Sequence, residues 1–210
     1  MAADDTKIAR ILEHPAVWRG SSAAAQPRGL PTGFALLDEH LPGNGWPRAG
    51  LIEILVARFG SGELSVLLPA LGALTRASAA RWCVWVAPPL MPFAPALVSC
   101  GIVLEQVAVV GGARPLWAFE QTLGSGACDA VLAWARHPQA RAIRRLQLAA
   151  ERGRTLGVLF RRRSAAREAS AAVLRLGLEP LAAGVRISLL KGRSARRGAV
   201  DLTWPAGWPV

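Results

Sequence analysis

The chain has 210 residues, 52% of them hydrophobic, and a formal net charge of +11, which suits one folded domain with short tails and a substantial core. Its apolar runs fall short of the roughly 18 residues that a membrane span needs, and its polar, acidic beginning is unlike a secretory signal. We therefore expect a cytoplasmic protein that makes no membrane contact.

The first segment places Ile8, Ile11, Leu12 and Val17 at roughly helical spacing, which predicts an N-terminal helix or arm over residues 1–20. A linker rich in small residues and proline is predicted over 21–30. The arm either docks on a partner or a neighbouring copy, or packs on its own domain. The main domain is predicted over 31–204, with a C-terminal tail at 205–210.

Within that domain, short apolar runs near 51–57, 82–87, 106–110, 129–134 and 155–160 alternate with helix-length stretches over 63–79, 94–101, 115–124 and 139–152. This alternation is typical of βαβ units. Pro69 is expected to kink or split the first helix. Segments 172–178, 184–190 and 199–204 alternate with period two and predict closing antiparallel strands. The expected fold is α/β, with a mostly parallel central sheet flanked by helices.

The segment from residue 50 to 64 is laid out like a strand and the phosphate loop of a nucleotide-hydrolysing enzyme. A Walker loop reads G-x-x-x-x-G-K-[ST], in which backbone N–H groups face phosphates, Lys neutralises charge and a hydroxyl binds magnesium. In this sequence those defining positions and the loop between them hold Ala57, Gly60, Ser61, Gly62, Glu63 and Leu64. Glu63 in place of Lys puts a like charge near a triphosphate, unfavourable by several kcal/mol at an effective dielectric of about 20.

The flanking residues extend this pattern. A turn at Thr32 and Gly33, a helix ending in Leu37 and Asp38, and a strand over 50–54 precede the loop. Together they resemble the RecA recombinase family. The resemblance implies a water-activating glutamate after the next strand and a magnesium-binding aspartate after a later one, where this chain has Pro89 and Trp134. The Walker lysine, the water-activating glutamate and the magnesium-binding aspartate are thus all replaced. We therefore expect a pseudo-ATPase with no catalytic residues, no bound metal and no cofactor.

Further segments point to one particular family within the RecA-like group. They span residues 88–97, 126–134, 157–161 and 189–193. The chain resembles the ImuA family, RecA-like accessory proteins of bacterial mutagenesis cassettes, over about residues 30–204. This implies a RecA-like core and a role in SOS-induced translesion DNA synthesis. The partners it implies are an ImuB-type inactive Y-family polymerase homologue and an error-prone C-family polymerase, with RecA as a further candidate.

The positive charge is concentrated in the second part of the chain. Residues 1–130 hold 9 Lys and Arg against 10 Asp and Glu, whereas residues 131–210 hold 16 against 4. A basic region rich in arginine is typical of a nucleic-acid surface, and an acidic protein partner is the other interpretation. The candidate contacts to single-stranded DNA or a partner are Arg141, Arg144, Arg145, Arg161, Arg162, Arg163, Arg167, Lys191, Arg193, Arg196 and Arg197.

The cysteine and tryptophan residues are the remaining candidates for a functional role. Cys83, Cys100 and Cys128 lie in apolar surroundings without metal-ligand spacing and predict buried, reduced thiols. Trp134 either fills the space of a nucleotide or is ordinary core. Trp204 and Trp208 either anchor a partner or pack the tail on the domain.

Two other functions stay open. One is an ATPase with a rearranged site that uses a downstream arginine in place of the Walker lysine. The other is a cell-division inhibitor of the SulA type, from the same RecA-like group, that binds the division GTPase FtsZ.

Overall fold

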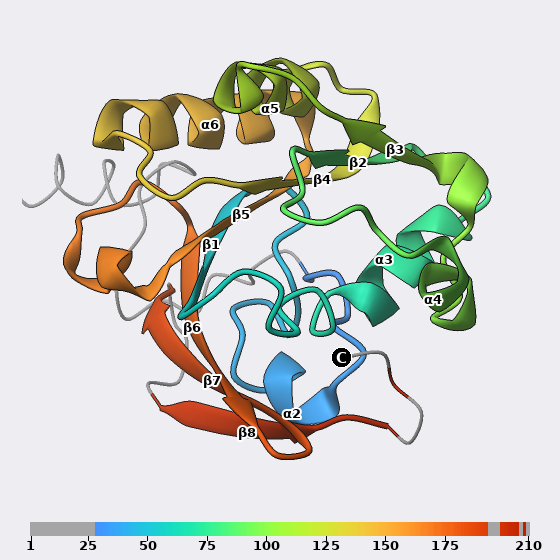
Figure 1. The fold of residues 1–210 in the computed structure, drawn as a ribbon, viewed down its shortest axis with the longest axis vertical. Coiled ribbons are helices and arrows are strands. Elements are labelled where there is room, and N and C mark those ends of the chain that lie inside the picture. Colours follow the sequence, from blue (N-terminus) through green and yellow to red (C-terminus); the bar gives the residue numbers. More distant parts are fainter. Residues whose placement is uncertain (1–27, 193–197, 206–207, 209–210) are drawn as a thin grey trace, which may run out of the picture.

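The computed structural model describes residues 28–192, 198–205 and 208 (Figure 1). The predicted arm at 1–20 and most of the predicted linker at 21–30 lie outside the described residues. So do Arg193, Arg196 and Arg197 and most of the predicted tail.

The described chain alternates strands and helices through its first two thirds and ends in consecutive strands. The strands are β1 (Gly50–Val56), β2 (Trp82–Val86), β3 (Val107–Val110), β4 (Cys128–Trp134), β5 (Leu156–Arg162), β6 (Leu174–Leu181), β7 (Gly184–Lys191) and β8 (Ala199–Thr203). The helices are α2 (Ala35–Asp38), α3 (Leu68–Thr75), α4 (Ala94–Ser99), α5 (Pro115–Gly124) and α6 (Ala140–Gly153), with 3-10 turns η1 (Leu104–Gln106) and η2 (Arg163–Arg167).

These strands form one 8-stranded sheet in the order β3-β2-β4-β5-β1-β6-β7-β8. β1 lies between β5 and β6 and is parallel to both, with Ile52 opposite Val158 and Leu174. β7 is antiparallel to β6 and β8 and so runs against the other strands of this sheet. The prediction of a mixed α/β fold with a mostly parallel sheet and antiparallel pairing at its C-terminal end is confirmed.

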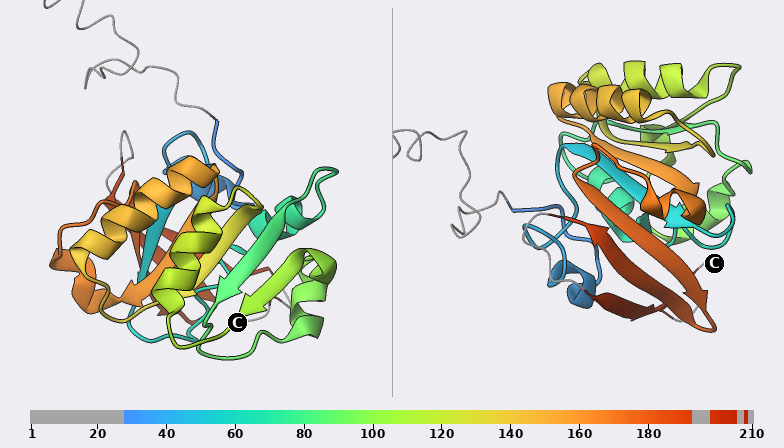
Figure 2. Two further views of the ribbon diagram at one scale, coloured as in Figure 1. Left: turned by 90° about the horizontal axis from the view of Figure 1, so that it is seen from above. Right: turned by 90° about the vertical axis from the view of Figure 1, so that its left-hand side faces the viewer.

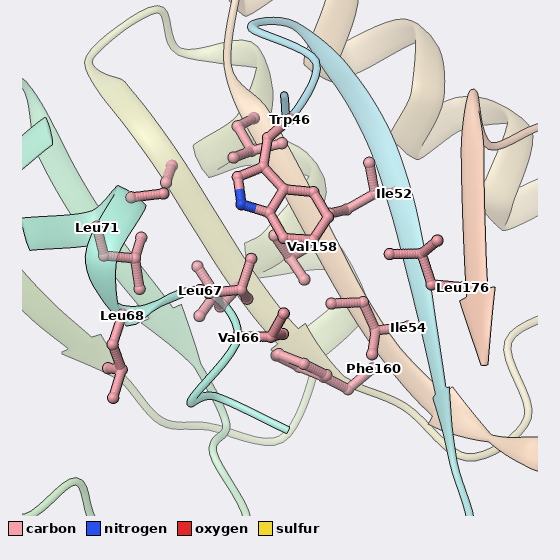
Figure 3. Close-up of a cluster of buried hydrophobic side chains, with 14 of the residues drawn as sticks. Trp46, Ile52, Ile54, Val66, Leu67, Leu68, Leu71, Val158, Phe160 and Leu176 are labelled. Atoms are coloured by element: carbon pink, nitrogen blue, oxygen red, sulfur yellow. The ribbon is translucent and has the colours of Figure 1, made fainter. Parts of the chain in front are cut away.

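Helices cover both faces of the sheet. Figure 2 shows α5 and α6 side by side on one face, where Phe119 and Ile143 pack against Leu51 and Val131. The opposite face carries the larger cluster drawn in Figure 3, in which Ile52 belongs to a layer completed by α3 and the chain around Trp46. Because neighbouring residues of a strand point to opposite faces, an uninterrupted apolar run such as 130–134 supplies both layers. Each fully buried Leu or Ile contributes about 1.5–3 kcal/mol.

The first long helix begins later than predicted. Residues 63–67 form turns, and α3 starts at Leu68 with Pro69 in its first turn. The predicted start at Glu63 is therefore wrong, and so is the kink, because proline in the first turn of a helix has no interior hydrogen bond to remove. The displaced start leaves Glu63 in the loop, which decides what its side chain contacts.

The chain before β1 is held by short-range contacts. The Thr32 N–H donates to the Asp38 carboxylate over 2.9 Å, and Leu30 forms an isolated antiparallel bridge with Trp46. Trp46 is fully buried. These contacts anchor the turn and the short helix α2 beside the sheet.

The C-terminal tryptophans pack on the domain. Trp204 meets Phe34 edge to face, with ring centroids 5.9 Å apart, and Trp204 and Trp208 are both partly buried against the larger cluster. Of the two interpretations for them, the described residues favour packing. None of the described helices is long and apolar enough to cross a membrane.

Candidate functional site

The candidate site lies where β1, β4 and β2 end. These strands are parallel, so their carboxyl ends meet at one edge of the sheet, which is where α/β folds bind ligands. The loop from Ala57 to Leu64 follows β1, Trp134 closes β4, and Pro88 and Pro89 follow β2. The sequence-predicted phosphate loop and the two replaced hydrolysis positions are thus brought together.

The loop turns sharply at two glycines. Gly60 has φ 78° and Gly62 has φ 83°, a left-handed conformation that glycine adopts without the steric cost of a Cβ. Between them, the Ser61 hydroxyl donates to the Arg58 carbonyl over 2.7 Å. This geometry directs the N–H groups of Gly60 and Ser61 toward the inside of the loop.

Glu63 fills the inside of the loop with its own carboxylate. Oε1 accepts the Gly60 N–H over 2.8 Å, and Oε2 accepts the Ser61 N–H over 2.9 Å. The residue is only 3% exposed. Backbone N–H groups of this kind hold phosphate in nucleotide-binding loops, so the two carboxylate oxygens stand where phosphate oxygens would be held. The sequence revealed the charge at this position but not that it turns back onto the loop amides.

Trp134 holds the carboxylate from the other side. Its indole Nε1 donates to Glu63 Oε1 over 3.2 Å, and its ring stacks on Phe160 with centroids 4.8 Å apart. The Trp85 ring is tilted relative to the Trp134 ring, and their centroids are 6.4 Å apart. A buried indole N–H needs an acceptor, and Glu63 supplies it, so Trp134 and Glu63 complete each other's hydrogen bonding.

An apolar pocket of about 290 Å³ adjoins this pair. Its walls include Leu64, Leu68, Trp85, Pro89, Leu97 and Trp134, and Glu63 is the one acidic or basic residue among those that line it. Leu90, Met91 and Phe93 stand at its mouth and are each at least 71% exposed. We call these three residues the apolar rim. The chemistry of this pocket suits apolar contact rather than proton transfer.

Arg161 is not a surface contact, so its sequence-based prediction is wrong. It is 1% exposed, and it binds Glu53 Oε1 over 2.9 Å and Glu168 over 2.6 Å. Arg175 binds the other oxygen of Glu53 over 2.6 Å. A buried carboxylate with two guanidinium partners links β1, β5 and β6, and burying these charges is tolerable because they are paired. Sequence reasoning missed Glu53 and Arg175 as partners.

The arginines at the end of β5 and in η2 differ in their surroundings. Arg162 donates to the Ala57 carbonyl, and its guanidinium lies over the Phe59 ring at 5.3 Å. Arg163 forms an ion pair with Glu179, and Arg167 is exposed. Arg162 therefore contacts the loop through the Ala57 carbonyl and the Phe59 ring.

The remaining predicted cations that the structure describes are exposed. Arg141, Arg144 and Arg145 lie on α6, and Arg145 pairs with Glu120 of α5 at 3.0 Å. The Lys191 ammonium donates to the Ser170 carbonyl over 2.7 Å at the end of β7. These described cations therefore belong to two different elements, α6 and β7.

The three cysteines are free thiols, and Cys83 and Cys128 are buried while Cys100 is half-buried. Burial, aided by the charge of Asp129, raises the pKa of Cys83 from 9.0 to about 12. Burial also raises the pKa of Cys100 and of Cys128. Within the described part of the chain, no group of three His, Cys, Asp or Glu side chains is placed to hold a metal ion.

No family model matches this chain, and neither does any curated protein. Among solved structures, SulA from Pseudomonas aeruginosa is similar with 24% sequence identity and a TM-score of 0.45, over 52% of this chain and 96% of SulA. A likeness of this degree establishes neither a function nor a partner for this chain.

Proposed function

We propose that this protein is a non-hydrolysing, RecA-like accessory protein of SOS-induced translesion DNA synthesis, and that it acts through protein contacts. The observation that carries the proposal is the occupied phosphate loop, in which the Glu63 carboxylate accepts both loop N–H groups. A nucleotide would have to displace a charged group that is tethered to the loop itself. The resemblance of the sequence to the ImuA family supplies the cellular role.

The residues around the loop support a pseudo-ATPase. Hydrolysis needs a base to activate water and an acid to hold magnesium. Pro89 and Trp134 occupy the corresponding strand ends, and neither side chain can accept a proton or bind a cation. The remaining carboxylate, Glu63, already accepts three hydrogen bonds.

The apolar rim supports a role in protein contact. Leu90, Met91 and Phe93 expose large apolar side chains next to one another at the mouth of the pocket. Contiguous exposed apolar surface of this kind marks interaction sites in soluble proteins. We propose that the ImuB-type homologue, the error-prone polymerase or RecA covers this rim.

A nucleotide titration tests the first half of the proposal. Trp134 lines the pocket, so ATP entering it is expected to quench tryptophan fluorescence, and a Trp134→Phe variant identifies that signal. We expect no change up to millimolar ATP with magnesium. Micromolar quenching, or ATP turnover that disappears in Gly62→Asp, would instead establish the rearranged ATPase.

Pull-down experiments test the second half. The tagged protein is mixed with purified ImuB-type homologue, C-family polymerase, RecA and FtsZ, at two salt concentrations and with or without single-stranded DNA. We expect capture of at least one of the first three, weakened in Phe93→Ser and retained in Leu36→Ser. Leu36 is a matched control because it is exposed but lies on α2, away from the rim. Retention of FtsZ alone would establish the SulA-type function.

A further inference from the structure

The outer surface of the α5 and α6 layer combines arginines with an exposed tryptophan. It is formed by residues at the start of α5 and along α6: Arg114, Trp117, Arg141, Arg144, Arg145 and Arg152. We call this set the arginine face. All six are exposed, and Trp117, at 53%, is among the most exposed tryptophans of the described chain.

The arginines of α6 face outward because the opposite side of the helix is apolar. Ile143, Leu146 and Ala150 are buried against the sheet. Arg141, Arg145 and Arg152 fall on the other side, at spacings that keep them in one row along the helix. These arginines and the exposed Leu148 thus form one row along the length of α6, with Arg144 beside it.

Contacts between the helices place Trp117 next to this row. Glu120 of α5 pairs with Arg145, and further along, Gly124 lies against the Arg152 guanidinium. The two helices therefore run in the same direction, side by side, as in Figure 2. One turn before Glu120 is Trp117, and one turn before Arg145 is Arg141, so these two are level. The Arg114 guanidinium lies over the Trp117 ring at 5.0 Å.

Little negative charge offsets this surface. Glu120 neutralises Arg145, and the Glu151 carboxylate accepts a hydrogen bond from Gln147. Arg114, Arg141, Arg144 and Arg152 form no ion pair with another described residue. Like charges one turn apart, such as Arg141 and Arg144, destabilise a helix by a few tenths of a kcal/mol. A polyanion bound to the face would remove that repulsion.

We propose that the arginine face binds single-stranded nucleic acid, with the arginines on phosphates and a base stacked on Trp117. Arginine forks match phosphate oxygens, and an exposed aromatic ring next to cations is the arrangement that stacks unpaired bases. The stacking residue selects the single strand, because bases of a duplex are already stacked on one another. This inference rests on the proposed role in DNA synthesis and names the surface that would reach the template strand.

Fluorescence anisotropy with a labelled 25-nucleotide single strand, and with the corresponding duplex, tests the inference at 50 and 200 mM salt. The face variant carries Arg141→Gln, Arg144→Gln and Arg152→Gln. Its matched control carries Arg28→Gln, Arg48→Gln and Arg76→Gln, which removes the same charge from exposed positions outside α5, α6 and the candidate-site loop. We expect the face variant to bind at least about tenfold more weakly at 50 mM salt, and the control to lose less than threefold.

Two further measurements distinguish binding at the arginine face from attraction by the protein's net charge. The slope of log affinity against log salt should fall by about 2 in the face variant, because each phosphate contact to a single strand contributes about 0.7. Trp117→Ala should weaken single-strand binding by about fivefold or more and leave duplex binding unchanged. Circular dichroism confirms that the variants fold.

Each contrary result overturns the inference. Equal loss in the face variant and its control would indicate attraction by net charge alone. No binding by the unaltered protein would exclude nucleic acid, and loss of a captured partner in the face variant without loss of DNA affinity would make this face a protein interface. If partner capture persists while DNA binding is absent, the inference fails and the proposed adaptor function stands.

Discussion

The indole N–H of Trp134 donates a hydrogen bond to the Glu63 carboxylate over 3.2 Å, although the two residues are 71 positions apart. One lies at the end of a strand and the other in the loop that follows a different strand. Each stands at a position where the RecA resemblance implies a residue for magnesium or phosphate. The two replacements thus form a contact with each other, which gives the loop an internal ligand.

Replacing Glu63 should destabilise the domain. In Glu63→Gln the carboxylate charge is lost, and the amide can accept only on its oxygen, so one loop N–H loses its partner. Hydrogen bonds to charged groups contribute about 1.5–3 kcal/mol, and we expect a loss in this range in urea unfolding. Glu39→Gln, at an exposed position of the same charge, should change stability by less than about 0.5 kcal/mol. Equal effects of the two would contradict the described role of Glu63.

Among the ion pairs of the described residues, those of Glu53 should lose the most stability on mutation. Glu53→Gln leaves Arg161 and Arg175 buried without the carboxylate that they share. Breaking a buried ion pair in this way costs about 3–5 kcal/mol. Urea or thermal unfolding measures the loss. Glu168→Gln removes a partner that is 52% exposed, and should cost about 1 kcal/mol or less. A milder effect for Glu53→Gln than for Glu168→Gln would show that the buried network is not stabilised as described.

Thiol alkylation should follow burial. Burial holds the pKa of Cys83 at about 12, so almost no thiolate exists at pH 8, and thiolate is the reactive form. Cys100 is half-buried and should react first with iodoacetamide, whereas Cys83 and Cys128 should react only when the protein unfolds. Mass spectrometry of native and guanidinium-treated samples identifies the modified sites. Native modification of Cys83 before Cys100 would be inconsistent with this order.

Stability should fall at alkaline pH. A thiol whose pKa is raised by folding favours the folded state below its unfolded pKa of 9.0, and this contribution declines as pH rises toward about 12. One such thiol contributes a slope of up to about 1.4 kcal/mol per pH unit. The chain has no tyrosine and two lysines, Lys7 and Lys191, so few other groups titrate there. Urea unfolding between pH 7 and 10.5 should show the decline, with a shallower slope in Cys83→Ala.

Much of the fold was predictable because buried parallel strands are continuous apolar runs. The runs near 51–57 and 129–134 coincide with β1 and β4. The parallel pairing of β6 with β1 was not predicted, because its period-two pattern equally suits an antiparallel strand. The start of α3 was misplaced because the helix-favouring residues 63–67 form turns, and Pro69 marks a beginning rather than a kink.

The candidate site was predictable in position but not in contacts. The loop and the strand ends could be aligned along the sequence, since parallel strands share one edge. The side-chain direction of Glu63 could not be predicted, because it depends on which way the loop amides point. Arg161 looked like part of a basic surface run with Arg162 and Arg163, yet its place in β5 turns it toward Glu53. Only the strand register, which joins positions 108 residues apart, reveals that pair.

The position of the Glu63 carboxylate inside its own loop bears on whether nucleotides could regulate this protein. A group attached to the backbone it binds has a fixed effective concentration. Under the proposed function, a change in the cell's supply of nucleotides would therefore not switch this protein on or off. Its output would then depend on how many copies are synthesised and how quickly they are degraded.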